Sequence, residues 1–473
     1  MKRLAFIGLF AVLLAAAAGA TTASAAPRPV LVGFEDEPSF LWAPTLVDNI
    51  AGAGEANANV LRLLVNWSTV ASRKPSRATN PNDPAYKFDG LDDAVFLAQQ
   101  RGERLLLTVW GTPKWASKTH KPNAAPAPAT LGSFCSALAS RYSGRSGHPP
   151  VTLFSVWNEP NLNQFLAPQY DKKGRDVAPR LYAGMFRACS AAIKRVNKSA
   201  LVAAGETSPR GVDHPRKNSR IQPSHTPGRF AQLVAAVKPR IHFDAWAHHP
   251  YGVGFTGRAT VPFRWPNVGV ADLPRLELNL KRWFKRPSVP LWVTELAYQT
   301  RPERKGALTY AQQAAYLKAA FLKAVAVPQV QMFIWFVYRD TPGERWQSGL
   351  VRSNGLDKPA MAVWKQVTAP YSVDNPTLAL KRGTAPNVAL PLVVLQSHFL
   401  PGDPPLGVDY KVYTAAGALV VGAQTTTVPN VTGTGTFSLA AFKPATAGVY
   451  KAQLAINDIH GNVVYRTITF IVR

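Results

Sequence analysis

The sequence predicts an α/β protein, a (β/α)8 TIM barrel followed by a small all-β, immunoglobulin-like sandwich domain. From Val30 to about Thr368, short β-branched runs alternate with amphipathic helical stretches, which is typical of a parallel sheet with crossover helices. Polar and aromatic residues follow the ends of these runs, where such a barrel carries its functional residues. Between Pro370 and Pro376 the helical periodicity stops, and only strand-like runs follow.

The first 25 residues have the features of a signal peptide. Lys2 and Arg3 precede an apolar run from Leu4 to Ala18, and Ala23-Ser24-Ala25 offers a small-residue cleavage site. An uncleaved membrane anchor is the alternative, but the run is short for a span of about 20 apolar residues. We therefore expect a secreted protein, extracellular or associated with the cell wall, that does not contact the membrane after cleavage.

The predicted barrel domain covers residues 26–370 and contains eight strand-like runs. These are Val30–Phe34, Val60–Asn66, Arg104–Val109, Val151–Val156, Ala200–Ala204, Phe243–Ala247, Leu291–Thr294 and Gln331–Phe336. Helical spacing of apolar residues is found in Leu91–Arg101, Leu131–Tyr142, Arg180–Val196, Phe230–Val237, Leu273–Phe284, Tyr310–Val325 and Met361–Val367. An open, doubly wound sheet is the alternative topology, but it would not require polar residues at the end of every strand.

The predicted sandwich covers residues 377–473. Its strand-like runs, separated by Pro, Gly, Asn and Asp turn signals, are Val388–Leu395, Asp409–Thr414, Leu419–Gly422, Thr436–Leu439, Tyr450–Asn457 and Val463–Val472. This domain could bind glycan or serve as a structural spacer. The second interpretation is favoured, because no aromatic platform for stacking sugars is visible.

The chain is strongly basic, with a formal net charge of +27 that falls to +25 without Lys2 and Arg3. No zinc-ligand spacing, basic helix or base-stacking module accompanies this charge, so nucleic acid is not expected as a partner. An anionic glycan or cell-wall polymer fits an exported protein better. Charge spread over the surface for solubility is the alternative.

Two cysteines, Cys135 and Cys189, lie in separate helix-patterned stretches among small and apolar residues. An oxidising compartment permits a disulfide if the two helices are neighbours. Two buried free thiols are the alternative, because spacing alone does not decide between them.

Two glutamates stand just past predicted strands on opposite sides of the ring. Glu159 follows the fourth strand in Asn158-Glu159-Pro160, and Glu295 follows the seventh in Thr294-Glu295-Leu296. Hydrolysis of a glycosidic bond needs one carboxylic acid to protonate the leaving oxygen and one carboxylate to attack or stabilise the anomeric carbon. Both glutamates would point across the mouth of the barrel, so this chemistry is predicted there.

The stretch Ser155-Val156-Trp157-Asn158-Glu159-Pro160-Asn161 resembles the acid/base strand of the large clan of retaining (β/α)8 glycoside hydrolases, which includes cellulase-like and β-xylosidase-like enzymes. The resemblance spans the barrel and implies a role for each matching position. It implies Glu159 as general acid/base, Glu295 as nucleophile, Asn158 as donor to a sugar hydroxyl, Arg62 and Tyr251 as partners of the nucleophile, His249 as a residue of the site, and Trp335 as a sugar-stacking floor.

Electrostatics accounts for different roles of the two glutamates. Two carboxylates about 5.5 Å apart at an effective dielectric of about 20 repel by roughly 3 kcal/mol, or about two pKa units. One of them therefore keeps a proton. Arg62, opposite Glu295, would hold that carboxylate ionised and leave the proton on Glu159.

Other candidates have competing interpretations. His248 and His249 are adjacent on a strand, so they point to opposite faces and no metal site is predicted. Trp110 could bind sugar or simply pack in a loop. Glu206, at the end of the fifth strand, is a secondary candidate for sugar binding.

The loop from Ser208 to Arg229 is rich in basic residues. It carries Arg210, His214, Arg216, Lys217, Arg220, His225 and Arg229. This loop could steer an anionic glycan toward the mouth, or it could be a solvated loop without such a role.

Together these patterns predict a secreted, monomeric, retaining glycosidase that needs no cofactor and cleaves O-glycosidic bonds of an extracellular oligo- or polysaccharide. Two alternatives stay open. A transglycosylase would use the same residues, and a non-catalytic glycan-binding protein of the cell wall would use the barrel as a scaffold.

Overall fold

A computed structural model describes residues 30–213, 222–253, 256–371, 377–391, 404–429, 434–457, 459 and 463–473. The predicted signal peptide, residues 1–25, lies outside these described residues. Within them, every helix is too short or too polar to cross a bilayer.

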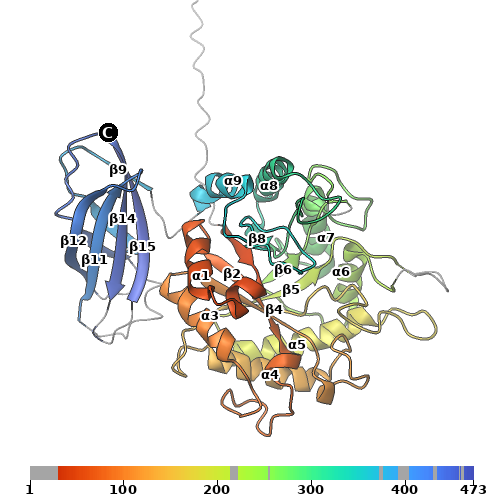
Figure 1. Cartoon of the computed structure of the whole chain (residues 1–473). Coiled ribbons are helices and arrows are strands. Elements are labelled where there is room, and N and C mark those ends of the chain that lie inside the picture. The colour runs from red at the N-terminus through yellow and green to blue at the C-terminus, as the bar shows by residue number, and fades with distance from the viewer. Residues whose placement is uncertain are drawn as a thin grey trace, which may run out of the picture.

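Eight parallel strands close into a barrel in sequence order, with β1 paired to β8 (Figure 1). The strands are β1 (Leu31–Glu35), β2 (Val60–Asn66), β3 (Arg104–Trp110), β4 (Leu153–Val156), β5 (Leu201–Thr207), β6 (Ala245–His248), β7 (Leu291–Val293) and β8 (Val330–Phe336). The predicted (β/α)8 barrel is confirmed, and each predicted strand overlaps an observed one.

Helices surround the barrel. They are α1 (Leu46–Glu55), α2 (Trp67–Val70), α3 (Asp89–Gln100), α4 (Pro128–Arg141), α5 (Ala178–Val196), α6 (Pro227–Ala236), α7 (Leu273–Phe284), α8 (Tyr310–Val325) and α9 (Pro359–Thr368). Short helical turns add Pro38–Trp42, Lys114–Ala116, Val270–Asp272 and Ala369–Tyr371. The sequence analysis missed α1, because Gly52 and Gly54 weaken its helical pattern.

The barrel strands separate two apolar cores. Inside the ring, a small core is built from Val60, Leu106, Leu153, Ala203, Ala245, Ala247, Trp292, Met332 and Ile334. A larger core fills the space between the strands and the helices. Because side chains alternate along a strand, Met332 and Ile334 place Phe336 on the inner side of β8, whereas Phe333 and Trp335 face the helices.

A disulfide joins the neighbouring helices α4 and α5. It links Cys135 to Cys189 with a Cα–Cα distance of 5.3 Å, and both residues are fully buried. The structure therefore has the disulfide and not the two free thiols that the sequence analysis left open.

The C-terminal domain is a two-sheet β-sandwich. Its strands are β9 (Thr377–Leu380), β10 (Asn387–Pro391), β11 (Leu406–Thr414), β12 (Leu419–Val428), β13 (Thr434–Ser438), β14 (Gly448–Asn457) and β15 (Val463–Val472). A five-stranded sheet in the order β12-β11-β14-β15-β9 shares an apolar core with the pair β10-β13. The sequence analysis missed β9, and residues 392–395 of the predicted run Val388–Leu395 lie outside the described residues.

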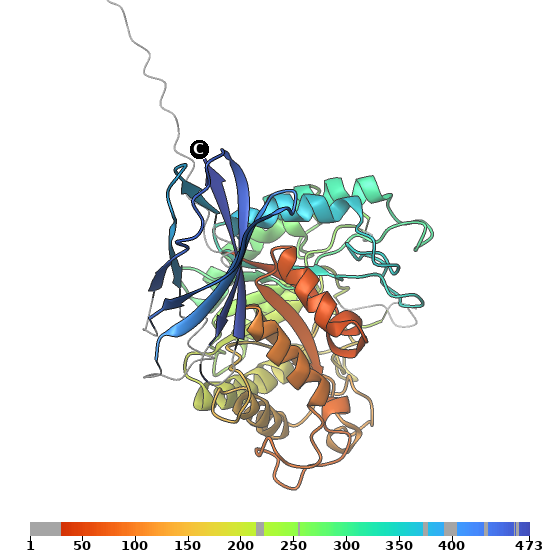
Figure 2. The same cartoon turned by 60° about the vertical axis from the view of Figure 1, so that its left-hand side comes forward.

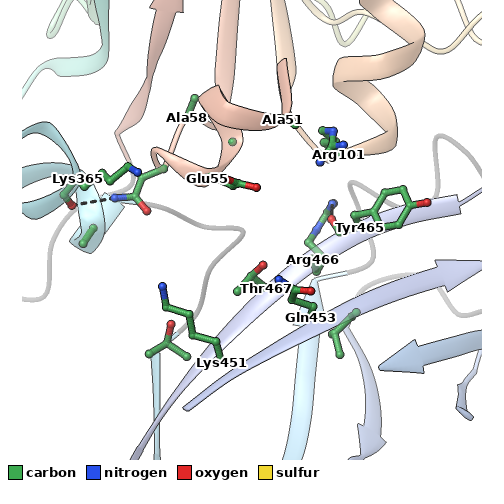
Figure 3. A pocket seen from close by; sticks show the side chains of 15 residues that line it. Ala51, Glu55, Ala58, Arg101, Lys365, Lys451, Gln453, Tyr465, Arg466 and Thr467 are labelled. Atoms are coloured by element: carbon green, nitrogen blue, oxygen red, sulfur yellow. Dashed lines mark hydrogen bonds between the residues drawn. The ribbon is translucent and has the colours of Figure 1, made fainter. Parts of the chain in front are cut away.

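The sandwich lies beside one end of the barrel, and the loop after β8 extends away from it (Figure 2). A polar cavity of about 620 Å³ separates parts of the two domains. Its lining includes Glu55, Arg101 and Lys365 from the barrel and Lys451, Gln453, Tyr465 and Arg466 from the sandwich (Figure 3). We call this space the junction cavity.

Candidate active site

Polar side chains from different strands meet at the C-terminal end of the barrel. Because the strands are parallel, their C-terminal ends open at the same face. The strand ends supply the residues Glu35 (β1), Asn158 and Glu159 (after β4), Glu206 (β5), His249 and Tyr251 (after β6) and Glu295 (after β7), and Arg62, inside β2, is paired with Glu35. The sequence had predicted that most of these side chains would converge here.

Arg62 is fully buried at the centre of the cluster, and its hydrogen-bond donors are all engaged. Nη1 donates to Glu35 and, over 2.9 Å, to Oε1 of Glu295. Nη2 donates to Oδ1 of Asn158 at 3.0 Å and to Oε2 of Glu206 at 3.2 Å, while Nε donates to Thr108. This single side chain therefore fixes the positions of three carboxyl groups and one amide.

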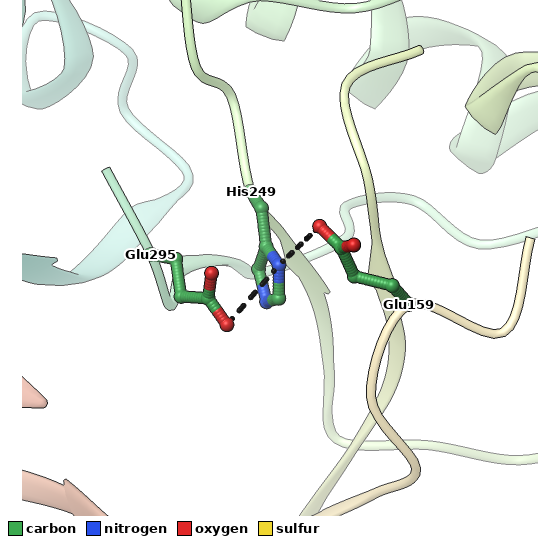
Figure 4. Close-up of side chains that lie close together, drawn as sticks. All are labelled: Glu159, His249 and Glu295. Carbon is green, nitrogen blue, oxygen red and sulfur yellow. Dashed lines mark hydrogen bonds and ion pairs between the residues drawn. The ribbon is translucent and has the colours of Figure 1, made fainter. Parts of the chain in front are cut away.

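His249 connects the two glutamates that were predicted to carry the reaction (Figure 4). Its Nδ1 lies 3.1 Å from Oε1 of Glu159 and 3.4 Å from Oε1 of Glu295. Its Nε2 lies 2.8 Å from Oε2 of Glu206. The neighbouring His248 points to the opposite side, where it contacts Thr207 and the carbonyl of Val268.

Glu159 and Glu295 are the two carboxyl groups of the cluster that reach the surface. Their side chains are 13% and 10% exposed, whereas those of Glu35 and Glu206 are completely buried. One oxygen of Glu159 and one of Glu295 lie within 4.8 Å of each other. Glu295 also accepts a hydrogen bond of 2.8 Å from the hydroxyl of Tyr251. A substrate at this opening would meet both carboxyl groups.

The surroundings give the buried groups different protonation states. Burial by itself would raise the pKa of Glu206, but Arg62 and His249 outweigh burial and lower it to about 2. Burial by itself would lower the pKa of His249, but Glu295, Glu159 and Glu206 together raise it to about 9. At neutral pH His249 is therefore an imidazolium that donates from both nitrogens.

Burial raises the pKa of two further carboxyl groups, Glu159 and Glu35. It raises that of Glu159 against the opposing effect of His249, and it raises that of Glu35 well above its usual range against the opposing effect of Arg62. The ionised Glu206 lies between Arg62 and His249, whereas Glu159 and Glu35 hold a proton more readily than free carboxyl groups do.

Glu159, His249 and Glu295 each present one potential metal-ligand atom within this space (Figure 4). Metal binding here would require His249 to lose the proton on its ligating nitrogen, so it would compete with protonation of the imidazole. Hydrogen bonding between these three groups accounts for their arrangement.

Two predicted substrate-binding residues occupy other positions than expected. Trp335 is completely buried on the outer side of β8 and donates a hydrogen bond from Nε1 to the carbonyl of Ser348, so the prediction of a sugar-stacking floor at this residue is wrong. Glu206 is also fully buried and contacts Arg62, His249 and Thr294. It positions these side chains and does not face a substrate, so its predicted sugar-binding role is wrong as well.

Trp110 ends β3 on the inner side of the barrel and is partly exposed. Its ring meets the ring of Phe165, from the loop after β4, edge to face at 5.8 Å. It keeps its predicted place at the mouth of the barrel.

Two aromatic side chains that were not predicted from the sequence lie near the nucleophile. Phe336 is partly exposed at the inner end of β8, and Trp346 lies against both Phe336 and Tyr251, each with ring centroids 5.5 Å apart. Alternation along β8 could have identified Phe336 instead of Trp335, provided that the inner residues had been assigned first. No pattern marked Trp346, because it lies in an irregular loop.

Part of the predicted basic loop, residues 214–221, lies outside the described residues. Of its described members, His225 is buried and hydrogen-bonded to Gln169 and Asp176, and Arg229 pairs with Asp176. His225, in the loop after β5, and Arg229, in α6, thus bind the loop after β4. Arg210 is exposed.

Several solved structures share the barrel. The GH5_18 protein of Bifidobacterium longum subsp. infantis aligns with a TM-score of 0.51 at 15% identity, covering 75% of this chain and 83% of that chain. The GH5_18 protein of Streptomyces cattleya in complex with GlcNAc aligns with a TM-score of 0.50 at 17% identity, covering 76% and 85%. A variant of the latter in complex with Manβ1-4GlcNAc gives 0.51 at 16% identity, covering 76% and 86%. These similarities concern the fold.

No curated protein sequence matches the chain significantly. The sequence model of the family described as cellulase, glycosyl hydrolase family 5, matches residues 28–337, which is more than half of the chain and almost the whole barrel. The matched segment contains both strand-end glutamates and the arginine and histidine that connect them. The chain therefore belongs to glycosyl hydrolase family 5 and is a glycosidase.

Proposed function

We propose that this glycosidase is a secreted, retaining enzyme that cleaves O-glycosidic bonds of an extracellular oligo- or polysaccharide. The observation that carries the proposal is the proximity of Glu159 and Glu295, whose nearest ligand oxygens lie within 4.8 Å at one opening. Retaining glycosidases place their two carboxyl groups about 5 to 5.5 Å apart, whereas inverting enzymes need about 6.5 to 9.5 Å to admit a water molecule. The spacing supports double displacement.

In the first step, an oxygen of Glu295 attacks the anomeric carbon while Glu159 protonates the departing glycosidic oxygen. The bond to the leaving group breaks, and an ester forms between the sugar and Glu295. Arg62 and Tyr251 hold Glu295 in place through hydrogen bonds of 2.9 and 2.8 Å. They orient the nucleophile before substrate arrives.

His249 determines which oxygen of Glu159 carries the proton. The imidazolium donates from Nδ1 to Oε1 of Glu159, so that oxygen acts as an acceptor. The acidic proton therefore resides on Oε2, and this oxygen is the one proposed to protonate the leaving group. This arrangement separates the positioning oxygen from the reacting one.

In the second step, water attacks the anomeric carbon, the bond between this carbon and the Glu295 oxygen breaks, and Glu159 takes a proton from the water. Glu295 carries no charge while it is esterified, so Arg62 and His249 then have one carboxylate fewer to balance. Their positive charge favours the ionised form of Glu159, which is the form needed for a base. The sugar leaves with retained configuration, and Glu159 ends protonated as it began.

Phe336 and Trp346 are proposed to hold the apolar face of the sugar. Both rings are partly exposed, and Trp346 packs on Tyr251, which itself contacts the nucleophile. Pyranose rings present C–H groups on one face that pack well against aromatic side chains. This aromatic pair takes the role that the sequence analysis assigned to Trp335.

Export is proposed from the features of residues 1–25, and it predicts a mature chain that begins near Ala26. Intact-mass analysis of protein recovered outside producing cells checks this point. A chain that retains Lys2 and Arg3 and stays with the cell membrane would contradict it.

The catalytic proposal is tested with a panel of aryl glycosides and polysaccharides. β-Mannosides and N-acetylglucosaminides belong in the panel because structural neighbours were crystallised with GlcNAc and Manβ1-4GlcNAc. Proton NMR of the first product formed reports the anomeric configuration. An inverted product would contradict the retaining mechanism, and new glycosides in place of released sugar would indicate a transglycosylase.

Variants assign the two roles. Glu159→Gln and Glu295→Gln should each lose activity, whereas Glu344→Gln, at an exposed position of the loop after β8, should keep it. A mechanism-based inhibitor should label Glu295. Full activity in either of the first two variants, or labelling of another residue, would overturn the assignment.

The charge of the substrate is tested separately. We also propose that the basic loop, residues 208–229, steers an anionic glycan toward the active site. Added salt should then slow turnover of an acidic polysaccharide more than that of a neutral one. An equal response of both substrates to salt would contradict this part of the proposal.

A further inference from the structure

Arg466 of β15 is a charged side chain of the sandwich that is almost completely buried, with 7% of its surface exposed. The face on which it lies borders the barrel beside the junction cavity (Figure 3). Its Nη1 donates a hydrogen bond of 2.7 Å to the carbonyl of Tyr465. An arginine buried this deeply needs a specific environment, because removing its charge from water is costly.

The barrel supplies that environment at the end of α3. The guanidinium packs directly on the backbone of Gly102, where a Cβ atom would overlap Cζ and both terminal nitrogens of Arg466. Gly102 has a φ of +78°, the left-handed conformation that often ends a helix and favours glycine. Gly102 therefore ends α3 and also leaves room for the arginine.

The electrostatics of this corner favour a cation. The carbonyl groups of the last turn of α3 give that end of the helix a partial negative charge. Glu103, the residue after Gly102, is buried at the same corner and packs over Gly54 of α1. On the other side of Gly102 in the chain, the guanidinium of Arg101 lies 5.7 Å from the centre of the Tyr465 ring. Arg466 thus brings a positive charge to a negatively polarised site.

Because the junction cavity separates other parts of the two domains, the contact of Arg466 with Gly102 contributes more to holding them together. Lys451 and Gln453 on the sandwich and Glu55 and Lys365 on the barrel line a space of about 620 Å³ instead of packing together. Among the described helices and strands, the closest contact between the domains is that of β15 with α3, where Tyr465 and Arg466 meet the end of this helix. Interfaces of this kind depend on a few buried residues, with arginine and tyrosine prominent among them.

We propose that the sandwich docks on the barrel through the insertion of Arg466 over Gly102, and that this contact makes the two domains unfold as one unit. The partner of this surface of β15 is thus the chain's own barrel. The sandwich is an integral support and not a freely tethered module.

The proposal also defines where the sandwich can act. Helices α1 and α3 run antiparallel to the strands, so their C-terminal ends lie at the N-terminal ends of β2 and β3. The catalytic carboxyl groups lie at the opposite ends of the strands. A sandwich docked at Gly102 therefore does not line the catalytic opening of its own barrel.

The test uses the full chain and differential scanning calorimetry. The wild type should unfold in a single transition. Arg466→Met, which keeps much of the side-chain volume but removes the charge, should produce two resolved transitions. Lys451→Met is the matched control, because it removes an exposed cation on the neighbouring strand β14 at the same cavity, and it should keep one transition.

A second pair of variants tests the barrel side. Gly102→Ala should also separate the transitions, because the methyl group displaces Arg466. Gly147→Ala controls for the backbone, since Gly147 has a φ of +80° and open space around its Cβ position. Small-angle X-ray scattering at 20 °C should show a larger radius of gyration for Arg466→Met and Gly102→Ala than for the two controls.

Independent transitions in the wild type would overturn the proposal. So would a single transition and an unchanged radius of gyration in both Arg466→Met and Gly102→Ala. If circular dichroism shows that one of these variants does not fold, the transitions and the radius of gyration of the other variant decide whether the proposal holds. None of these measurements requires a substrate, so the result does not depend on the proposed catalytic function.

Discussion

Substitution of Glu206 by glutamine should change the protonation of His249. Oε2 of Glu206 lies 2.8 Å from Nε2 of His249, and both side chains are fully buried. The substitution removes a negative charge but keeps the size of the side chain. Because a nearby negative charge favours the protonated imidazole, its loss must lower the pKa of His249.

The size of the effect follows from the geometry. With charge centres about 4 Å apart and an effective dielectric of about 20, the interaction amounts to about 4 kcal/mol, or about three pKa units. The pKa of His249 is about 9 in the wild type. In Glu206→Gln it should therefore fall to about 6. At pH 7.5 the ring would change from almost fully protonated to mostly neutral.

The measurement is a pH titration of the imidazole nitrogens by NMR in protein labelled with 15N-histidine. The signals of His249 are identified by their loss in a His249→Gln variant. Thr294→Val is the control, because Thr294 also donates to Oε2 of Glu206, at 2.7 Å, but carries no charge. In this control His249 should titrate close to its wild-type value.

The reasoning would be refuted if His249 titrated at the same pH in Glu206→Gln as in the wild type. Arg62 keeps Glu35 and Glu295 as partners in the variant, so the fold should persist. Loss of one partner from a buried charge network costs about 3 to 5 kcal/mol, and thermal unfolding would report this loss.

Three further predictions concern stability and binding. Replacing Cys135 and Cys189 by serine opens a loop spanning 54 residues and should lower the unfolding free energy by up to about 4 kcal/mol in urea titrations; an unchanged midpoint would contradict this. Burial raises the pKa of Asp36 to about 6, so this group should cost about 3 kcal/mol of stability as pH rises from 4 to 7, a loss absent in Asp36→Asn. Trp346→Ala should raise KM, whereas Trp335→Phe should lower only the melting temperature.

The sequence by itself determined the architecture of the barrel and its main chemical residues. Alternation of β-branched and amphipathic segments is a local pattern, so it revealed all eight strands without knowledge of their pairing. A parallel barrel brings the C-terminal ends of its strands to one face, and therefore Glu159 and Glu295 could be placed together from their positions in the chain. Residue type then limited the chemistry to acid, base and nucleophile.

Tertiary structure decided the features that depend on direction and on contacts between distant segments. Whether Trp335 or Phe336 faces the interior depends on the phase of β8 relative to the ring, and a shift of one residue reverses the two sides. Glu206 stands at a strand end like the reactive glutamates, but contacts with Arg62 and His249 bury it. The proton on His249 likewise results from three carboxyl groups that come from three different strand ends.

The contact between the two domains could not be predicted from the sequence either. Gly102 and Arg466 are separated by more than 360 positions, and neither belongs to a recognisable motif. Their contact requires both the end of α3 and one face of β15. Local patterns determine which elements form, but burial, charge balance and contact depend on how those elements pack, and only the folded chain contains that information.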